Sequence, residues 1–138
     1  MAPSRSVVKQ REHVVSAVAD RLGRDERVVA VLPFALTPKR PKPPRKVRDG
    51  IYQSYRRYRP LVVTNRRLFV LDTARTPHPR GVLAEFPIDA VDIVDVVPMR
   101  LGQQRLLLDL PGLGTVPFVL GRYELDDLAE LRASIERR

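Results

Sequence analysis

The first apolar pattern along the chain is helical. Its apolar residues recur at spacings of three, four and seven, and they share one helical face: Val7, Val8, Val14, Val15, Val18 and Leu22. Ser4 or Ser6 is suited to cap the first turn, and Gly23 is suited to follow the last one. Arg11 falls inside the apolar stripe, where its aliphatic stem can pack while its charge reaches solvent. We therefore predict an N-terminal amphipathic helix within residues 1–25.

Short apolar and β-branched runs follow, bounded by turn-forming residues. They predict strands rather than helices because each run is only about four to ten residues long. Pro33 lies inside the first run and predicts a bulge or an edge position there. Asn65 tolerates a left-handed backbone, so 64–67 is expected to form a tight hairpin turn. The seven predicted strands are 27–36, 61–64, 68–72, 82–86, 91–97, 105–110 and 115–120.

A second helical pattern closes the chain after Gly121. Its apolar face is formed by Leu125, Leu128, Ala129, Leu131 and Ile135. Acidic residues gather at its start (Glu124, Asp126 and Asp127) and arginines near its end (Arg132, Arg137 and Arg138). This order of charges complements the helix dipole, so it supports the prediction of a C-terminal helix.

The ordered set of elements resembles the bacterial pleckstrin-homology-like (PH-like) domains, close to the GRAM domains. In that family an apolar strand ends in Thr-Asn or Thr-Asp, passes one or two residues and restarts at Arg-Leu. Here Thr64-Asn65 is followed by Arg66 and then by Arg67-Leu68. The stretch 86–91 resembles the aromatic-Pro-turn approach to the family's fifth strand, and 125–135 matches its capping helix.

The resemblance covers about residues 26–137 and implies a mainly β fold of the α+β class. That fold is a bent, partly open barrel of seven strands, capped at one end by the C-terminal helix. The helix within 1–25 is then an addition, and 26–138 forms the PH-like domain. The chain departs from the compact family pattern by a basic, Pro-rich insertion at 37–59, between the first two strands.

Composition limits the class of protein. A length of 138 residues fits one domain with one core, and 43% hydrophobic residues are too many for a wholly disordered chain. The chain has no cysteine, which excludes disulfides, a thiol nucleophile and Cys-ligated metal sites. No apolar run approaches the roughly 20 residues that span a bilayer, and no secretory signal follows the first methionine. We therefore expect a cytoplasmic domain.

The positive charge is concentrated in one place. The whole chain carries a formal net charge of +9, and residues 37–59 alone carry nine basic residues and one acid, a net of +8. Four prolines lie in the first part of this segment. Because proline and charge bury little apolar surface, 37–50 is expected to be a flexible or polyproline-like loop.

The resemblance gives this segment a candidate role. In eukaryotic PH domains, phosphoinositide headgroups dock at the loop between the first two strands, on a Lys and a later basic-x-basic triplet. Lys46 and the triplet 57–59 match that order here. Arginine suits phosphate because its planar fork donates two parallel hydrogen bonds. The candidate anion-binding residues are Lys39, Arg40, Lys42, Arg45, Lys46, Arg48, Arg56, Arg57 and Arg59.

Three tyrosines, Tyr52, Tyr55 and Tyr58, are interleaved with these arginines. Tyrosine rings can sit at the headgroup level of a membrane, or stack on the bases of single-stranded nucleic acid. They can also simply pack over the mouth of the barrel. The sequence thus favours an anionic membrane surface or phosphate-bearing ligand as partner. Nucleic acid, and a protein partner or second copy docked at an open strand edge, remain alternatives, as does a solvated loop.

No pattern points to catalysis or to a cofactor. The chain contains no nucleophile elbow, no phosphate-binding glycine loop and no HExxH motif. His13 and His78 lie 65 residues apart without a cysteine or acidic cluster, so no metal site is expected. Asp92 and Asp95 would point to opposite faces of a strand. The sequence therefore predicts a non-enzymatic binding module, peripheral at the inner face of the membrane.

Overall fold

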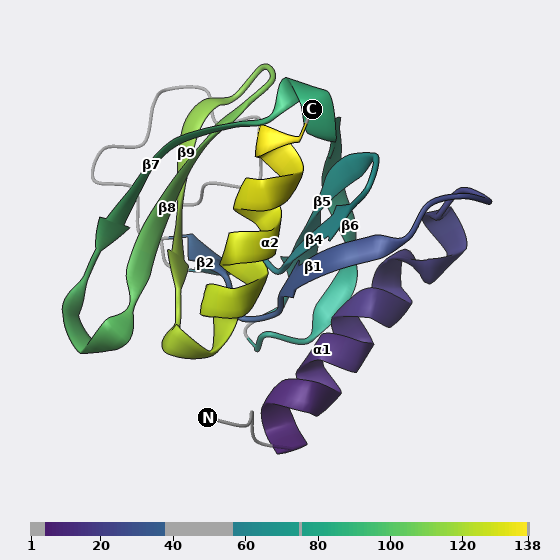
Figure 1. Ribbon diagram of the computed structural model, residues 1–138. Coiled ribbons are helices and arrows are strands. Elements are labelled where there is room, and N and C mark those ends of the chain that lie inside the picture. Colours follow the sequence, from purple (N-terminus) through teal and green to yellow (C-terminus); the bar gives the residue numbers. More distant parts are fainter. Residues whose placement is uncertain (1–4, 38–56, 75, 138) are drawn as a thin grey trace, which may run out of the picture.

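The computed structural model describes residues 5–37, 57–74 and 76–137 (Figure 1). In these ranges the chain forms two antiparallel sheets and two α-helices, α1 (Arg5–Val18) and α2 (Leu125–Glu136). The strands are β1 (Val28–Leu32), β2 (Leu36–Thr37), β3 (Arg57–Tyr58), β4 (Leu61–Thr64), β5 (Arg67–Thr73), β6 (Pro79–Pro87), β7 (Asp92–Pro98), β8 (Gln104–Leu110) and β9 (Gly114–Leu120). Four short 3-10 turns complete the list: η1 (Ala19–Arg21), η2 (Ile88–Ala90), η3 (Arg100–Gly102) and η4 (Arg122–Glu124).

The two sheets share the first part of the chain. One has the strand order β1-β4-β5-β6, and the other has the order β3-β2-β9-β8-β7. The single strand predicted over 27–36 is therefore divided, because Pro33 and Phe34 form a turn between β1 and β2. The segment that pairs with it is divided in the same way, because β3 pairs with β2 in one sheet and β4 pairs with β1 in the other. The prediction of a bulge at Pro33 anticipated the place but not the change of sheet.

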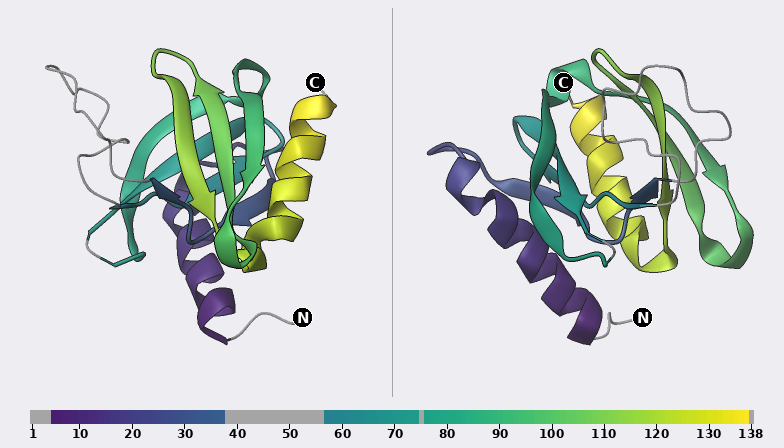
Figure 2. Two further views of the ribbon diagram at one scale, coloured as in Figure 1. Left: turned by 90° about the vertical axis from the view of Figure 1, so that its left-hand side faces the viewer. Right: turned by 180° about the vertical axis from the view of Figure 1, so that it is seen from behind.

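The core lies between the two sheets. Alternate residues of β8 and β9 point inward, as a period of two requires: Leu106, Leu108 and Leu110, and Val116, Phe118 and Leu120. Helix α2 (yellow in Figures 1 and 2) contacts β1 and β7 and packs Leu128 and Leu131 into this core. The predicted C-terminal helix is confirmed, and so is its apolar face except for Ala129, which is exposed.

A second apolar cluster lies on the outer face of the four-stranded sheet. There α1 (purple in Figures 1 and 2) packs Val14 and Val18 against apolar side chains of β1, β4 and β5. Strands β4 and β5 are consequently covered on both faces, which is why their apolar runs do not alternate. The predicted N-terminal helix is confirmed, although the α-helix ends at Val18 and continues only as a 3-10 turn.

The structure shows why Arg11 lies in the apolar stripe of α1. Its Nη1 and Nη2 donate to the two carboxylate oxygens of Asp127 in α2, at 2.6 and 2.9 Å. Asp127 Oδ1 also accepts the backbone N–H of Val31 in β1 at 3.1 Å. One carboxylate thus joins both helices to the sheet between them. Among the described residues, no helix is long and apolar enough to cross a membrane.

Candidate functional site

The basic segment begins and ends at neighbouring positions on one sheet. Thr37, the last described residue before it, pairs with Arg57, the first described residue after it, on strands β2 and β3. The Oγ1 of Thr37 also donates to the backbone carbonyl of Arg57 at 3.1 Å. Nine of the predicted site residues lie outside the described part of the chain: Lys39, Arg40, Lys42, Arg45, Lys46, Arg48, Arg56, Tyr52 and Tyr55.

Arg57 is tied to the domain. Its Nε and Nη2 both donate to the backbone carbonyl of Thr73, at 3.1 and 2.7 Å. Thr73 closes β5, and its Oγ1 donates to the carbonyl of Tyr58 at 2.7 Å. Arg57 therefore fixes β3 to the end of β5, which holds one end of the basic segment in place.

Arg59 lies inside the barrel wall. Its side chain is 1% exposed, and its Nη1 lies 3.2 Å from Asp72 Oδ1 and 3.2 Å from the carbonyl of Tyr58. These bonds give Arg59 a structural role, and its contact with an anionic ligand stays a prediction. The charge count of the sequence could not separate this arginine from its neighbours, since its partner Asp72 is thirteen residues away.

Tyr58 is half-buried at the edge of a pocket of about 410 Å³, which also has Phe34 and Glu124 in its wall. The carboxylate of Glu124 accepts the backbone N–H groups of Gly121 and Phe34, at 3.0 and 3.1 Å. Burial nevertheless raises the pKa of Glu124 to about 7, against the lowering effect of those two bonds. The pocket thus carries a carboxyl group that titrates near neutrality.

The β4–β5 turn at 64–67, which carries the family resemblance, is stabilised by hydrogen bonds from its own side chains. Thr64 Oγ1 accepts the backbone N–H groups of Arg66 and Arg67, at 3.1 and 2.9 Å, and donates to Glu26 Oε2 at 2.6 Å. Asn65 Oδ1 accepts the backbone N–H of Arg27 at 2.8 Å. The side chains of the turn therefore fasten it to the start of β1, and the predicted hairpin is confirmed.

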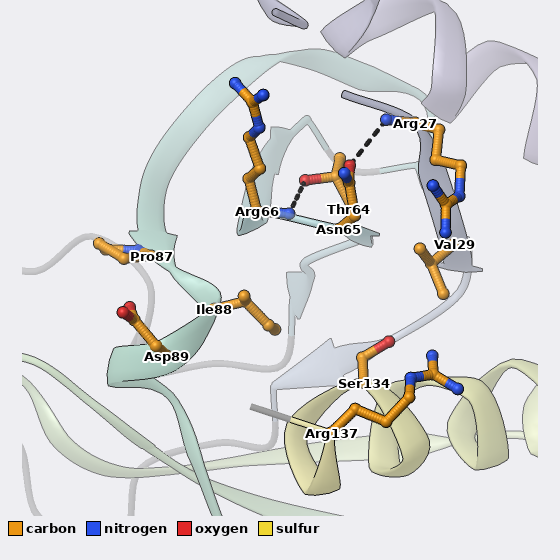
Figure 3. A pocket seen from close by; sticks show the side chains of 10 residues that line it. All are labelled: Arg27, Val29, Thr64, Asn65, Arg66, Pro87, Ile88, Asp89, Ser134 and Arg137. Carbon is orange, nitrogen blue, oxygen red and sulfur yellow. Dashed lines mark hydrogen bonds between the residues drawn. The ribbon is translucent and has the colours of Figure 1, made fainter. Parts of the chain in front are cut away.

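This fastened turn forms one wall of a pocket of about 610 Å³ (Figure 3). The pocket lies between the start of β1, the β4–β5 turn, η2 and the end of α2. Its charged residues are Arg27, Arg66, Arg137 and Asp89. Sequence reasoning treated 64–67 and 86–91 only as signatures of the fold, and missed that the two stretches meet at one pocket.

The two histidines meet across the surface. His13 Nδ1 of α1 and His78 Nδ1 lie 3.4 Å apart, and their rings are perpendicular. Beside them, Gln10 Nε2 donates to the carbonyl of Pro77 at 2.6 Å. Within 5–37, 57–74 and 76–137, no group of three or more His, Cys, Asp or Glu side chains is arranged to hold a metal ion. The pair instead contributes to the contact of α1 with the loop before β6.

Comparison with known proteins finds likeness in structure rather than in sequence. No family model and no curated protein matches the chain. A DUF1696 family protein with a pleckstrin-homology domain from Shewanella loihica PV-4 superposes with a TM-score of 0.53 and 13% identity, over 92% of this chain and 91% of that one. A pleckstrin homology domain from Shewanella amazonensis SB2B gives a TM-score of 0.47 and 16% identity, over 92% and 96%.

Proposed function

We propose that this chain, which has the fold of a bacterial PH-like domain, is a non-enzymatic module that binds an anionic membrane surface through its basic segment. The observation that carries the proposal is the concentration of charge. Residues 38–56 hold seven basic residues and one acid, a net of +6, which leaves +3 of the total +9 for the rest of the chain. Phosphate-bearing headgroups are the ligands that such a segment attracts.

The attachment of the segment supports this role. Its two ends are held by the pairing of Thr37 with Arg57 and by the bonds from Arg57 to Thr73. Because each basic residue near an anionic leaflet contributes about 1 kcal/mol, several acting together give useful affinity without a shaped pocket. Arg57 and Arg59 act in this proposal as anchors of the segment, and the remaining seven basic residues supply the contact.

Co-sedimentation with vesicles tests the proposal. Six residues, Lys39, Arg40, Lys42, Arg45, Lys46 and Arg48, are changed together to Gln, and Arg57 and Arg59 are kept because they hold the barrel. The matched control changes six exposed basic residues elsewhere: Arg5, Lys9, Arg24, Arg80, Arg100 and Arg132. Wild type and control should bind vesicles with anionic lipid, and the segment variant should not. Equal binding of neutral and anionic vesicles, or full binding by the segment variant, would exclude the proposal.

Nucleic acid is the second candidate, favoured by the tyrosines interleaved with arginines at 52–59. It predicts a steep loss of affinity with salt, because each phosphate that is neutralised releases counterions. A gel-shift titration with a single-stranded oligonucleotide at low salt, run on the same three proteins, separates the two candidates. A complex with the oligonucleotide but none with anionic vesicles would replace the membrane by nucleic acid.

A further inference from the structure

A second basic site lies at the end of the strand pair opposite to Thr37 and Arg57, the described residues that flank the basic segment. The segment 38–56 joins the ends of β2 and β3, whereas the pocket of Figure 3 lies at the start of β1 and the end of β4. These are opposite ends of the same bent pair of strands. The pocket is about 610 Å³ in volume, which is within the range of sites for small molecules. Its chemistry can therefore be considered independently of the segment.

Two arginines of this pocket carry charge that no acidic partner balances. Figure 3 shows the guanidinium ends of Arg27 and Arg137 on the same side of the pocket, with Val29 and Ser134 between them. Among the described residues, no ion pair involves Arg27 or Arg137. Arg66 points away from the pocket, and its Nη2 lies 4.0 Å from Asp25 Oδ2. An anion placed between Arg27 and Arg137 would receive two guanidinium forks, which is the geometry that phosphate prefers.

Ser134 lies in α2 one turn before Arg137, on the wall of the pocket. Its Oγ is closed off from solvent and has no hydrogen-bond partner among the described residues, so this hydroxyl is not counted as a donor to a ligand. The two exposed arginines are therefore the groups that an anion in the pocket would meet.

The rest of the lining limits the kind of anion. Asp89 lies across the pocket from Arg27 and Arg137, so an extended polyanion would meet a like charge there. Val29, Pro87 and Ile88 add an apolar surface. A ligand that carries one phosphate on an apolar or ring-shaped body satisfies both conditions. Its phosphate would lie between the two arginines, and its body would lie against the apolar side chains.

We infer that this pocket binds a phosphate monoester, held by Arg27 and Arg137. The ligand can be a free small molecule or the headgroup of a phosphomonoester lipid, because both present the same dianion. The pocket and the membrane-binding segment are then two separate anion sites on one domain.

Phenyl phosphate is a suitable probe, since it joins one phosphate to one apolar ring. A titration followed by amide ¹H–¹⁵N NMR at pH 7.5 and low salt should give saturable shifts at Asn65 and Ser134. Changing Arg27 and Arg137 together to Gln should weaken binding at least about tenfold, because two charge-assisted contacts are lost. Both arginine side chains are exposed, so the melting temperature should stay unchanged.

The matched control changes Arg100 and Arg105, two exposed arginines outside the pocket, to Gln and should bind phenyl phosphate like wild type. The six-residue segment variant should also bind it normally, so failure of vesicle binding and failure of this inference are distinguishable. Weaker binding to phosphatidic acid vesicles by the pocket variant than by wild type would identify a lipid headgroup as the ligand. Equal vesicle binding by the two proteins, with phenyl phosphate binding lost only in the pocket variant, would identify a soluble ligand. No saturable shift, or equal affinity in the pocket variant, would overturn the inference.

Discussion

Arg67 donates two hydrogen bonds to the buried carboxylate of Glu26, from Nε to Oε2 at 2.9 Å and from Nη2 to Oε1 at 2.7 Å. Thr64 Oγ1 and the backbone N–H of Gly23 donate to the same carboxylate, at 2.6 and 2.9 Å. The guanidinium also lies over the ring of Phe69, 4.8 Å from its centre. One ion pair thus joins the segment after α1 to the β4–β5 turn and to the second apolar cluster.

Removing the cation should therefore destabilise the fold. Arg67→Ala leaves the carboxylate of Glu26, which is almost wholly buried, without its charged partner. Breaking one side of such a pair costs about 3 kcal/mol of unfolding free energy. The neighbouring Arg66→Ala should cost less than about 0.5 kcal/mol, because its contact with Asp25 is exposed and long. Urea unfolding of the two variants compares them directly, and equal losses would contradict this account.

The same carboxylate should make the fold sensitive to acid. The bonds from Arg67 lower the pKa of Glu26 from 4.5 to about 2, so this group stabilises the fold when it is ionised. The contribution is present above pH 4.5 and is lost as the pH falls towards 2, and it amounts to about 3 kcal/mol. Unfolding free energies measured from pH 6 to pH 2 should fall more steeply in wild type than in Glu26→Gln. Parallel curves would show that the pair is not responsible.

Glu124 should act in the opposite direction. Burial raises its pKa from 4.5 to about 7, so the fold favours the protonated form. The stabilisation is complete below pH 4.5 and is lost as the pH rises through 7. Wild type should therefore lose stability between pH 5 and pH 8, and Glu124→Gln should lose less over the same range. A steeper decline in the variant would mean that the carboxylate form, with its bonds from Gly121 and Phe34, is the stable one.

Features of this fold could be predicted from the sequence where the interacting residues are close along the chain. The helices, the β8–β9 hairpin and the turn at 64–67 were predictable because periodicity and turn chemistry are local. The pairing of Arg59 with Asp72 and that of Arg11 with Asp127 were not, since each joins residues that only the fold brings together. The pocket at Ser134 was not predictable for the same reason, because only the fold brings the turn at 64–67 close to the end of α2.

Arg59 offers a test of whether a basic residue belongs to the ligand site or to the barrel. Its buried bonds to Asp72 and to the carbonyl of Tyr58 predict that Arg59→Gln lowers the unfolding free energy by about 2 kcal/mol or more. At a temperature where the variant remains folded, its binding to anionic vesicles should match that of wild type. Lys46→Gln should show the reverse, with weaker vesicle binding and unchanged stability. Weaker binding by a fully folded Arg59→Gln would return this residue to the ligand site.

The ion pair between the two helices should have a small coupling free energy, whereas Asp127→Ala alone should lower the unfolding free energy by more. Arg11 is about half exposed, so its pair with Asp127 should contribute only about 0.5 to 1 kcal/mol in a double-mutant cycle of Arg11→Met and Asp127→Ala. Asp127→Ala alone should cost more than Arg11→Met, because it also leaves the backbone N–H of Val31 without its acceptor. Urea unfolding of the four proteins gives both quantities. Equal costs for the two single variants would mean that the bond to Val31 adds nothing, and that Asp127 serves only as the partner of Arg11.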